Sequence, residues 1–177
     1  KKVLMLEANG QVGGAAITRE FADGFTVSAC AHLLYQLQPA VRRDLNLDPD
    51  LASEDMMTIA LHENGNHVRI KGNTVAGALD GDDDAYKAFH KRMSRFADVL
   101  KAVLNKTPPR LGSKNFSDLA ALAKLGFDIR RMGKTEMEAF LRLIGMNIYD
   151  EVMERFESDA LRGALCADAV MGTHLGP

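Results

Sequence analysis

The sequence predicts a mixed α/β fold, with short strands before residue 72 and helices after residue 81. Up to Gly72, apolar residues alternate or form short runs that are broken by turn residues. From Asp82 onward they recur every three or four positions, which is the helical period. The 177-residue chain is 46% hydrophobic, a share typical of a globular protein with a core.

The first element expected is a short strand, Val3 to Leu6, which ends at Glu7. Two adjacent glycines, Gly13 and Gly14, follow six residues later. A carboxylate at a strand end can accept both hydroxyl hydrogens of a ribose, and glycines let the backbone approach a cofactor closely. An exposed acid followed by a flexible turn gives the same residues. The residues alone leave both interpretations open.

A second strand-like stretch covers residues 25 to 34, where Phe25, Val27 and Ala29 alternate. Pro39 then suits the first turn of a short helix over residues 39–47, because its missing N–H is not needed there.

The clearest local signal is a hairpin over residues 57–71, with Asn64-Gly65 as a two-residue turn. Centring on that turn pairs Leu61 with Val68 and Ile59 with Ile70. We therefore expect one wholly apolar face, and a polar face that includes His62 and His67.

A long helix is predicted from Asp82, whose neighbouring acids suit the positive end of the helix dipole. Its apolar stripe follows four- and three-residue spacing: Phe89, Met93, Phe96, Leu100 and Val103. Thr107 and the two prolines after it end this helix.

Three more helices complete the expected order. Ser117 is expected to cap a short helix over residues 118–127. Thr135 and Glu138 form a capping box for a longer helix that Gly145 bends or splits. Ser158 is expected to cap the last helix.

Composition excludes several classes of protein. The net charge of −2 provides no basic footprint, so nucleic acid is not expected as a partner. No apolar run reaches the roughly 20 residues that a membrane span requires. Cys30 and Cys166 are far apart, which fits two buried thiols in a reducing compartment. We expect a cytoplasmic protein, with an organelle matrix as the alternative, and the oligomeric state stays open.

Two metal-like motifs fail on spacing. His62 and His67 are five residues apart across a turn, whereas a metalloprotease needs four on a helix. The acids at 80, 82 and 84 lack the glycine and the bidentate glutamate of a calcium loop. No metal site is predicted. His32 lies among apolar residues and is interpreted as a core histidine rather than a catalytic one.

The stretch VLMLEANGQVGGAAITREF, residues 3–21, resembles the flavin-containing amine oxidase and phytoene desaturase superfamily. In that superfamily a strand runs into a Glu, and a Gly-Gly pair begins six residues after it, the spacing of Glu7 and Gly13-Gly14 here. The continuation after Gly24 and the tail over residues 156–177 resemble the phytoene-dehydrogenase-related proteins, most closely the group of pyridine nucleotide-disulphide oxidoreductase domain-containing protein 2.

This resemblance implies FAD as the cofactor and hydride transfer from an organic, apolar small-molecule substrate to the flavin. It makes Glu7 the ligand of the FAD adenosine ribose, and it places the backbone of Gly13 and Gly14 against the cofactor. Thr18 matches the hydroxyl position of the motif, although a plain strand hydroxyl is the equal alternative. Ala15 stands where many relatives have Arg, so a cationic contact is missing or comes from elsewhere. No residue is assigned as the catalytic base.

The resemblance also implies a domain organisation. Residues 1–35 are expected to be a remnant of a Rossmann-like FAD-binding domain, and residues 36–177 a substrate or cap domain of sheet covered by helices. A dinucleotide fold places its glycine-rich first turn about 20 residues before such a glutamate, and only six residues precede Glu7. We therefore expect an internal fragment that is inactive by itself. The alternative is a non-catalytic binding module of the same fold.

Overall fold

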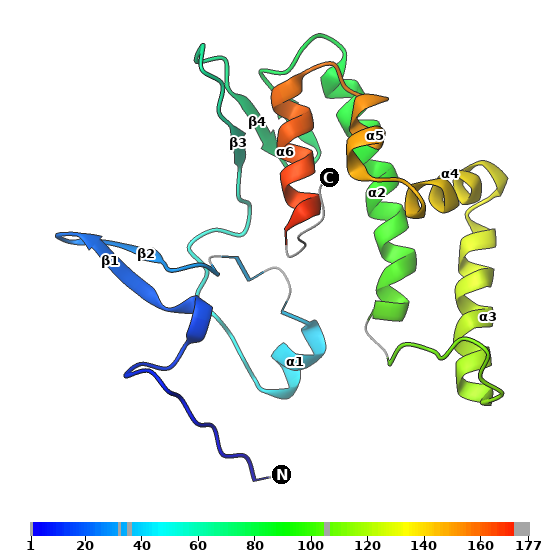
Figure 1. Ribbon diagram of the computed structural model, residues 1–177, viewed down its shortest axis with the longest axis horizontal. Coiled ribbons are helices and arrows are strands. Elements are labelled where there is room, and N and C mark those ends of the chain that lie inside the picture. The colour runs from blue at the N-terminus through cyan, green and yellow to red at the C-terminus, as the bar shows by residue number, and fades with distance from the viewer. Residues whose placement is uncertain (1, 32, 35–36, 105–106, 172–177) are drawn as a thin grey trace. The chain divides into compact units, whose positions relative to one another are not determined.

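The computed structural model describes residues 2–31, 33–34, 37–104 and 107–171, and it confirms a mixed α/β fold (Figure 1). The chain divides into two compact units, residues 1–52 and 53–177. Each unit is described by itself. No described helix is both long enough and apolar enough to cross a bilayer.

The first unit is built around a short hairpin. The 3-10 helix η1 (Gly14–Ala16) leads into strand β1 (Thr18–Ala22), which pairs antiparallel with β2 (Phe25–Ser28). Asp23 and Gly24 connect the strands, and Gly24 has a φ of +77°, which glycine adopts without strain. Helix α1 (Pro39–Asp44) begins at the proline, as predicted.

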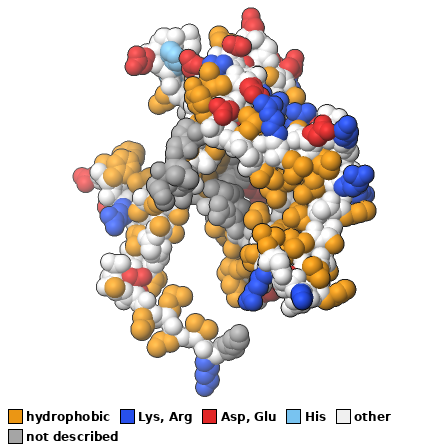
Figure 2. Space-filling view, turned by 45° about the vertical axis from the view of Figure 1, so that its right-hand side comes forward, with side chains coloured by type: hydrophobic (Ala, Val, Ile, Leu, Met, Phe, Trp, Pro, Cys, Tyr) orange, Lys and Arg blue, Asp and Glu red, His pale blue; other side chains and the backbone are white. Residues whose placement is uncertain are grey.

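The predicted strand over Val3 to Leu6 is wrong. The segment forms no regular element, and its four apolar side chains are 81–85% exposed. Figure 2 shows hydrophobic side chains, in orange, along the extended N-terminal segment at the bottom of the view. A strand needs a neighbour for its N–H and C=O groups, and no described residue hydrogen-bonds to residues 3–6. The apolar run is therefore not sufficient for a strand.

The second unit contains a three-stranded antiparallel sheet: β3 (Thr58–Ala60), β4 (Val68–Lys71) and β5 (Thr74–Ala76). The predicted hairpin exists, but its register is shifted by one residue. Ala60 pairs with Val68 and Thr58 with Ile70. A seven-residue loop, 61–67, replaces the two-residue turn.

Packing on the helices explains this register. Val68 is 1% exposed, and the small Ala60 opposite it lets α6 (Asp159–Val170) pack against β3. The predicted register would place Leu61 on that face, but Leu61 is 77% exposed. Bonds within the loop, described with the site below, hold its backbone N–H groups and keep Asn64-Gly65 out of a two-residue turn.

The third strand was not predicted. Gly72 and Asn73 make a two-residue turn between Lys71 and Thr74, and Gly72 has a φ of +54°. This turn places Val75 opposite Ile70 on the buried face of the sheet. A Gly-Asn pair between strand-forming residues is a known hairpin signal.

Helix α2 (Asp82–Leu104) confirms the predicted apolar stripe. Two clusters of buried residues pack along it. The first joins the sheet, α2 and the last two helices: Val68, Val75, Tyr86, Phe89, Val152, Phe156 and Leu161. The second, Phe96, Met132 and Phe140, lies where α2 meets the next two helices.

Helix α3 (Phe116–Arg131) is longer than predicted. Asn115, not Ser117, is its N-cap, and the Asn115 side-chain oxygen accepts from the Ser117 N–H and hydroxyl. Gly126 stays inside the helix, since a glycine in a helix interior costs only about 1 kcal/mol.

The capping box at Thr135 and Glu138 is also wrong. Helix α4 (Lys134–Ile144) has Gly133 as its N-cap, with no side-chain cap, because the φ of +92° at Gly133 sets the boundary earlier. Glu138 instead lies 4.0 Å from the Lys134 ammonium. The predicted break at Gly145 is confirmed, and Asn147 caps a separate helix, α5 (Ile148–Met153).

The cap of the last helix is confirmed, because the Ser158 hydroxyl oxygen accepts from the Leu161 N–H at 3.4 Å. The expected pair of buried thiols is wrong. Cys30 is exposed, and Cys166 is half-buried, where burial raises the pKa of its thiol. The short β1–β2 hairpin cannot enclose a side chain on its own, which explains the exposure of Cys30.

Candidate functional site

Glu7 lies on an exposed turn rather than at a strand end. Its Oε1 accepts from the backbone N–H of Asn9 at 2.8 Å and from the Asn9 side-chain amide at 2.9 Å. These bonds, the backbone one first, hold the pKa of the Glu7 carboxyl below its ordinary value. A weaker backbone hydrogen bond from Ala8 lowers this pKa further. The carboxylate is thus ionised, oriented and accessible.

The two glycines adopt backbone conformations that other residues rarely adopt. Gly13 has a φ of +136° and Gly14 a φ of +53°. A Cβ on Gly13 would lie 3.2 Å from the Ile17 side chain, whereas a Cβ on Gly14 would meet nothing within 4 Å. The turn itself therefore requires glycine at both positions, and the face above Gly14 is open.

Backbone hydrogen bonds fix this turn to the second strand. The Ala31 N–H donates to the Ala15 carbonyl at 2.9 Å, and the Ala29 N–H donates to the Ile17 carbonyl at 2.7 Å. Thr18 begins β1 opposite Ser28 and is exposed. Gly13, Gly14 and Thr18 are thus brought together on one ordered segment. No hydrogen bond between described residues joins Glu7 to that segment.

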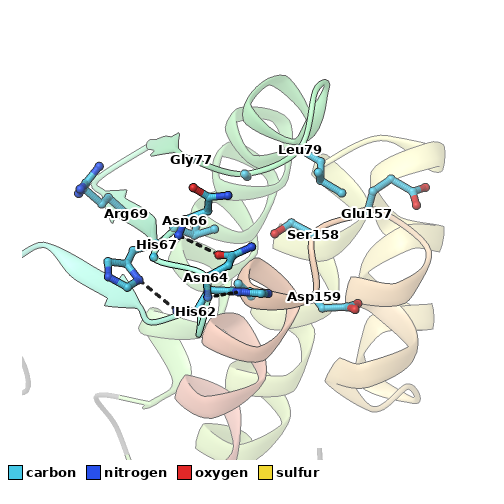
Figure 3. A pocket seen from close by; sticks show the side chains of 14 residues that line it. His62, Asn64, Asn66, His67, Arg69, Gly77, Leu79, Glu157, Ser158 and Asp159 are labelled. Atoms are coloured by element: carbon cyan, nitrogen blue, oxygen red, sulfur yellow. Dashed lines mark hydrogen bonds between the residues drawn. The ribbon is translucent and has the colours of Figure 1, made fainter.

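A second site, which sequence reasoning missed, lies in residues 53–177. It is a pocket of about 580 Å³ between three segments: the end of the β3–β4 hairpin (62–69), residues 77–79 and residues 157–160 (Figure 3). We call it the loop pocket. The His62 ring lies on the side of the loop that faces the start of α6 (Figure 3).

Two contacts between distant parts of the chain build the loop pocket. Asp82 is 2% exposed, and its two oxygens accept from the Glu157 and Ser158 N–H groups, each at 2.9 Å. This carboxylate fixes the start of α6 to the start of α2. Gly77 lies against the hairpin so closely that a Cβ would be 2.4 Å from the His67 carbonyl oxygen. In the sequence, these two contacts are marked only by an acidic residue at position 82 and a glycine at position 77.

The two histidines of the loop pocket contact each other through the backbone. The His62 N–H donates to His67 Nδ1 at 3.1 Å, and the Asn64 N–H donates to His62 Nδ1 at 3.4 Å. The described part of the chain contains no group of three His, Cys, Asp or Glu residues able to hold a metal ion. His32 lies outside the described residues.

Comparison with known proteins identifies several similar relatives, among them the following two. Pyridine nucleotide-disulfide oxidoreductase domain-containing protein 2 of Mus musculus is 25% identical over 98% of this chain, and its Rattus norvegicus counterpart is 23% identical over 98%. The chain spans about a third, 34%, of the length of each relative. No family model and no solved structure matches the chain.

These relatives support a broad relationship between this chain and proteins named for a pyridine nucleotide-disulfide oxidoreductase domain. The names of these relatives do not mention the phytoene dehydrogenase and amine oxidase superfamily. Membership of that superfamily stays a prediction.

Proposed function

We propose that this chain is part of an FAD-dependent oxidoreductase in which the flavin accepts a hydride from an organic, apolar small molecule. Residues 1–35 would belong to the FAD-binding part and residues 36–177 to the substrate part. Nearly the whole of this chain, 98%, matches relatives whose names include the word oxidoreductase. This similarity supports the reaction class.

The observation that carries the proposal is the pairing of an ionised Glu7 with an open glycine turn. Asn9 orients the Glu7 carboxylate through Oε1, and the exposed carboxylate can accept from a ribose diol. The open face at Gly14 allows backbone to approach a flat or charged group closely. The residues present therefore fit FAD in two ways. Glu7 can bind the adenosine ribose, and the main chain of Gly13 and Gly14 can lie against the cofactor.

The exposed apolar side chains of the first unit support the same proposal. A soluble monomer rarely exposes four consecutive apolar residues, and such runs mark surfaces that another part covers. Residues 3–6 would become a strand once neighbouring strands supply hydrogen-bond partners. The segment would then hold Glu7 at a strand end, as the resemblance implies.

When bound, FAD supplies the hydride-accepting ring. This chain would contribute orientation and exclusion of water. Glu7 fixes the ribose, the hydroxyl of Thr18 offers one further hydrogen bond, and the apolar side chains limit access of water. Ala15 offers no charge toward the phosphates, so a cation for them must come from another residue.

The test is a titration with FAD, followed by flavin fluorescence, of this chain and of a polypeptide extended to the relatives' length. Pyrophosphate affinity comes from a glycine-rich turn that opens a helix, and these 177 residues contain no such motif. We expect weak or undetectable binding by the 177-residue chain and clear binding by the extended polypeptide.

Variants of the extended polypeptide then test the residues. Glu7→Ala should weaken FAD binding by roughly ten- to a hundred-fold, because a charge-assisted hydrogen bond is lost. Glu20→Ala is the matched control, since Glu20 is an exposed acid of the same unit that binds the Gly24 N–H. Tight, stoichiometric binding by the 177-residue chain, or equal affinity of the Glu7→Ala variant, would contradict the proposal.

A further inference from the structure

Three side chains of the β3–β4 loop, those of His62, His67 and Asn64, each have one acceptor atom occupied inside the loop itself. Nδ1 of His62 accepts from the Asn64 N–H, and Nδ1 of His67 accepts from the His62 N–H. Because each ring accepts through Nδ1, its other nitrogen, Nε2, carries a proton in both the neutral and the charged form.

The loop asparagine follows the same pattern. Asn64 Oδ1 accepts from the Asn66 N–H at 2.9 Å, which leaves the Asn64 amide N–H₂ for another partner. The side chains of Arg69 and His67 point away from the start of α6 in Figure 3, whereas the His62 ring lies on the side that faces it. His62 and Asn64 therefore each keep a donor, the ring Nε2–H and the amide N–H₂, for a ligand in the pocket.

The opposite wall of the loop pocket provides one further hydrogen-bond donor and two carboxylates. Ser158 is buried and its oxygen already accepts from Leu161, so the Ser158 hydroxyl hydrogen is what it can offer. Two carboxylates, Glu157 and Asp159, also line the pocket. Both pair with Arg162, at 3.9 Å and 2.9 Å, and both side chains are more than 80% exposed to solvent.

We propose that the loop pocket binds a small metabolite through an oxyanion, a phosphate or a carboxylate, held by His62, Asn64 and Ser158. A wall of donors pairs with a group made of acceptors. The volume of about 580 Å³ is in the range of small-molecule sites. This site uses none of the FAD residues proposed above, so the two proposals stand or fall separately.

The test is an amide NMR titration of the 177-residue chain with inorganic phosphate and, separately, with acetate, at constant ionic strength set by sodium chloride. We expect saturable shifts at residues 62–67 and 158–160 with at least one of the two anions. The anion that binds more tightly then identifies the group. No saturable shift with either anion would overturn the proposal.

Asn64→Asp is the sharpest variant, because it keeps the oxygen that accepts from Asn66 while replacing the donor amide by a negative oxygen. Binding of the anion should weaken at least about ten-fold. Asn115→Asp is the matched control, since Asn115 likewise accepts through Oδ1 but caps α3 away from the pocket lining. Equal affinity in Asn64→Asp, or an equal loss in Asn115→Asp, would contradict a specific site.

A second pair of variants covers the case in which Asn64→Asp disturbs the loop. His62→Ala removes one donor and should weaken binding, whereas His90→Ala, on α2 beside Tyr86, should not. Thermal unfolding of each variant shows that the fold is kept. Unchanged affinity in His62→Ala would remove the ring from the site.

Discussion

The two units of the chain contain similar aromatic pairs in very different surroundings. In residues 53–177, Phe89 and Phe156 meet edge to face at a centroid distance of 5.5 Å, and both are buried. In residues 1–52, Phe21 and Phe25 lie 6.3 Å apart and are 70% and 64% exposed. The rings are in contact in both pairs, so the two pairs differ in their burial.

The same contrast holds for the whole of each unit. All of the buried apolar side chains among the described residues lie in the second unit. The described residues of the first unit include none that is buried. The proposed FAD residues thus lie on a turn and a hairpin that have no buried side chains. The packed core belongs to the second unit.

The largest effect is expected from the aromatic pairs. Phe156→Ala should lower the free energy of unfolding by about 3–5 kcal/mol, because it leaves a cavity in the core. Phe25→Ala should change it by less than about 0.5 kcal/mol. Urea unfolding of both variants measures the difference. Similar losses in the two variants would show that the first unit has a core of its own.

Next comes the buried carboxylate. Asp82→Ala should cost about 2–3 kcal/mol, because two buried N–H groups lose their acceptor. Asp83→Ala, one residue along on the exposed side of α2, should lower the unfolding midpoint far less, because its ion pair with Lys87 is exposed to solvent. An Asp82→Ala midpoint equal to that of Asp83→Ala would show that Asp82 does not hold the start of α6.

Gly→Ala substitutions in the two units should differ less in their effect on the free energy of unfolding. Gly77→Ala adds a Cβ next to the His67 carbonyl at a φ of +83°, and should destabilise the second unit by roughly 2 kcal/mol. Gly24→Ala also has a positive φ but open space around it, in a unit without a core. Its unfolding curve should match that of the parent chain. A Gly24→Ala loss as large as that of Gly77→Ala would contradict the separation of the units.

The smallest effect concerns pH at Glu7. The pKa of its carboxyl is depressed in the folded chain, so the Glu7–Asn9 turn is favoured above the unfolded pKa and weakens as pH falls through the folded pKa. Asn9→Ala removes the side-chain bond but keeps the larger backbone one, so it should raise the pKa of Glu7 only part of the way toward its ordinary value. An NMR titration of the Glu7 side chain measures this. An unchanged pKa would show that the Asn9 side chain does not contribute.

Sequence reasoning predicted best where a signal extends over many residues or depends on one local contact. The stripe of α2 repeats over 23 residues, and the Ser158 cap needs only Leu161 nearby. The hairpin register failed by one position because acceptors on His62, His67 and Asn64 lengthen the loop. Alternation of apolar residues does not report such bonds.

The candidate sites show the same division. The Glu7 and Gly13-Gly14 spacing is local, and it could be proposed from the sequence alone. The loop pocket could not, because its walls meet only through contacts such as Asp82 with Ser158, which are 76 residues apart. The strand at residues 3–6 failed for a related reason, since a strand depends on partners as much as on its own residues.

Amide hydrogen exchange of the 177-residue chain tests most directly the claim that the proposed FAD segment lacks a core of its own. The account predicts strong protection in α2 and α6, up to the global free energy of unfolding, and exchange from local opening in residues 2–31. Protection of the Thr18–Ser28 hairpin equal to that of α6 would contradict it.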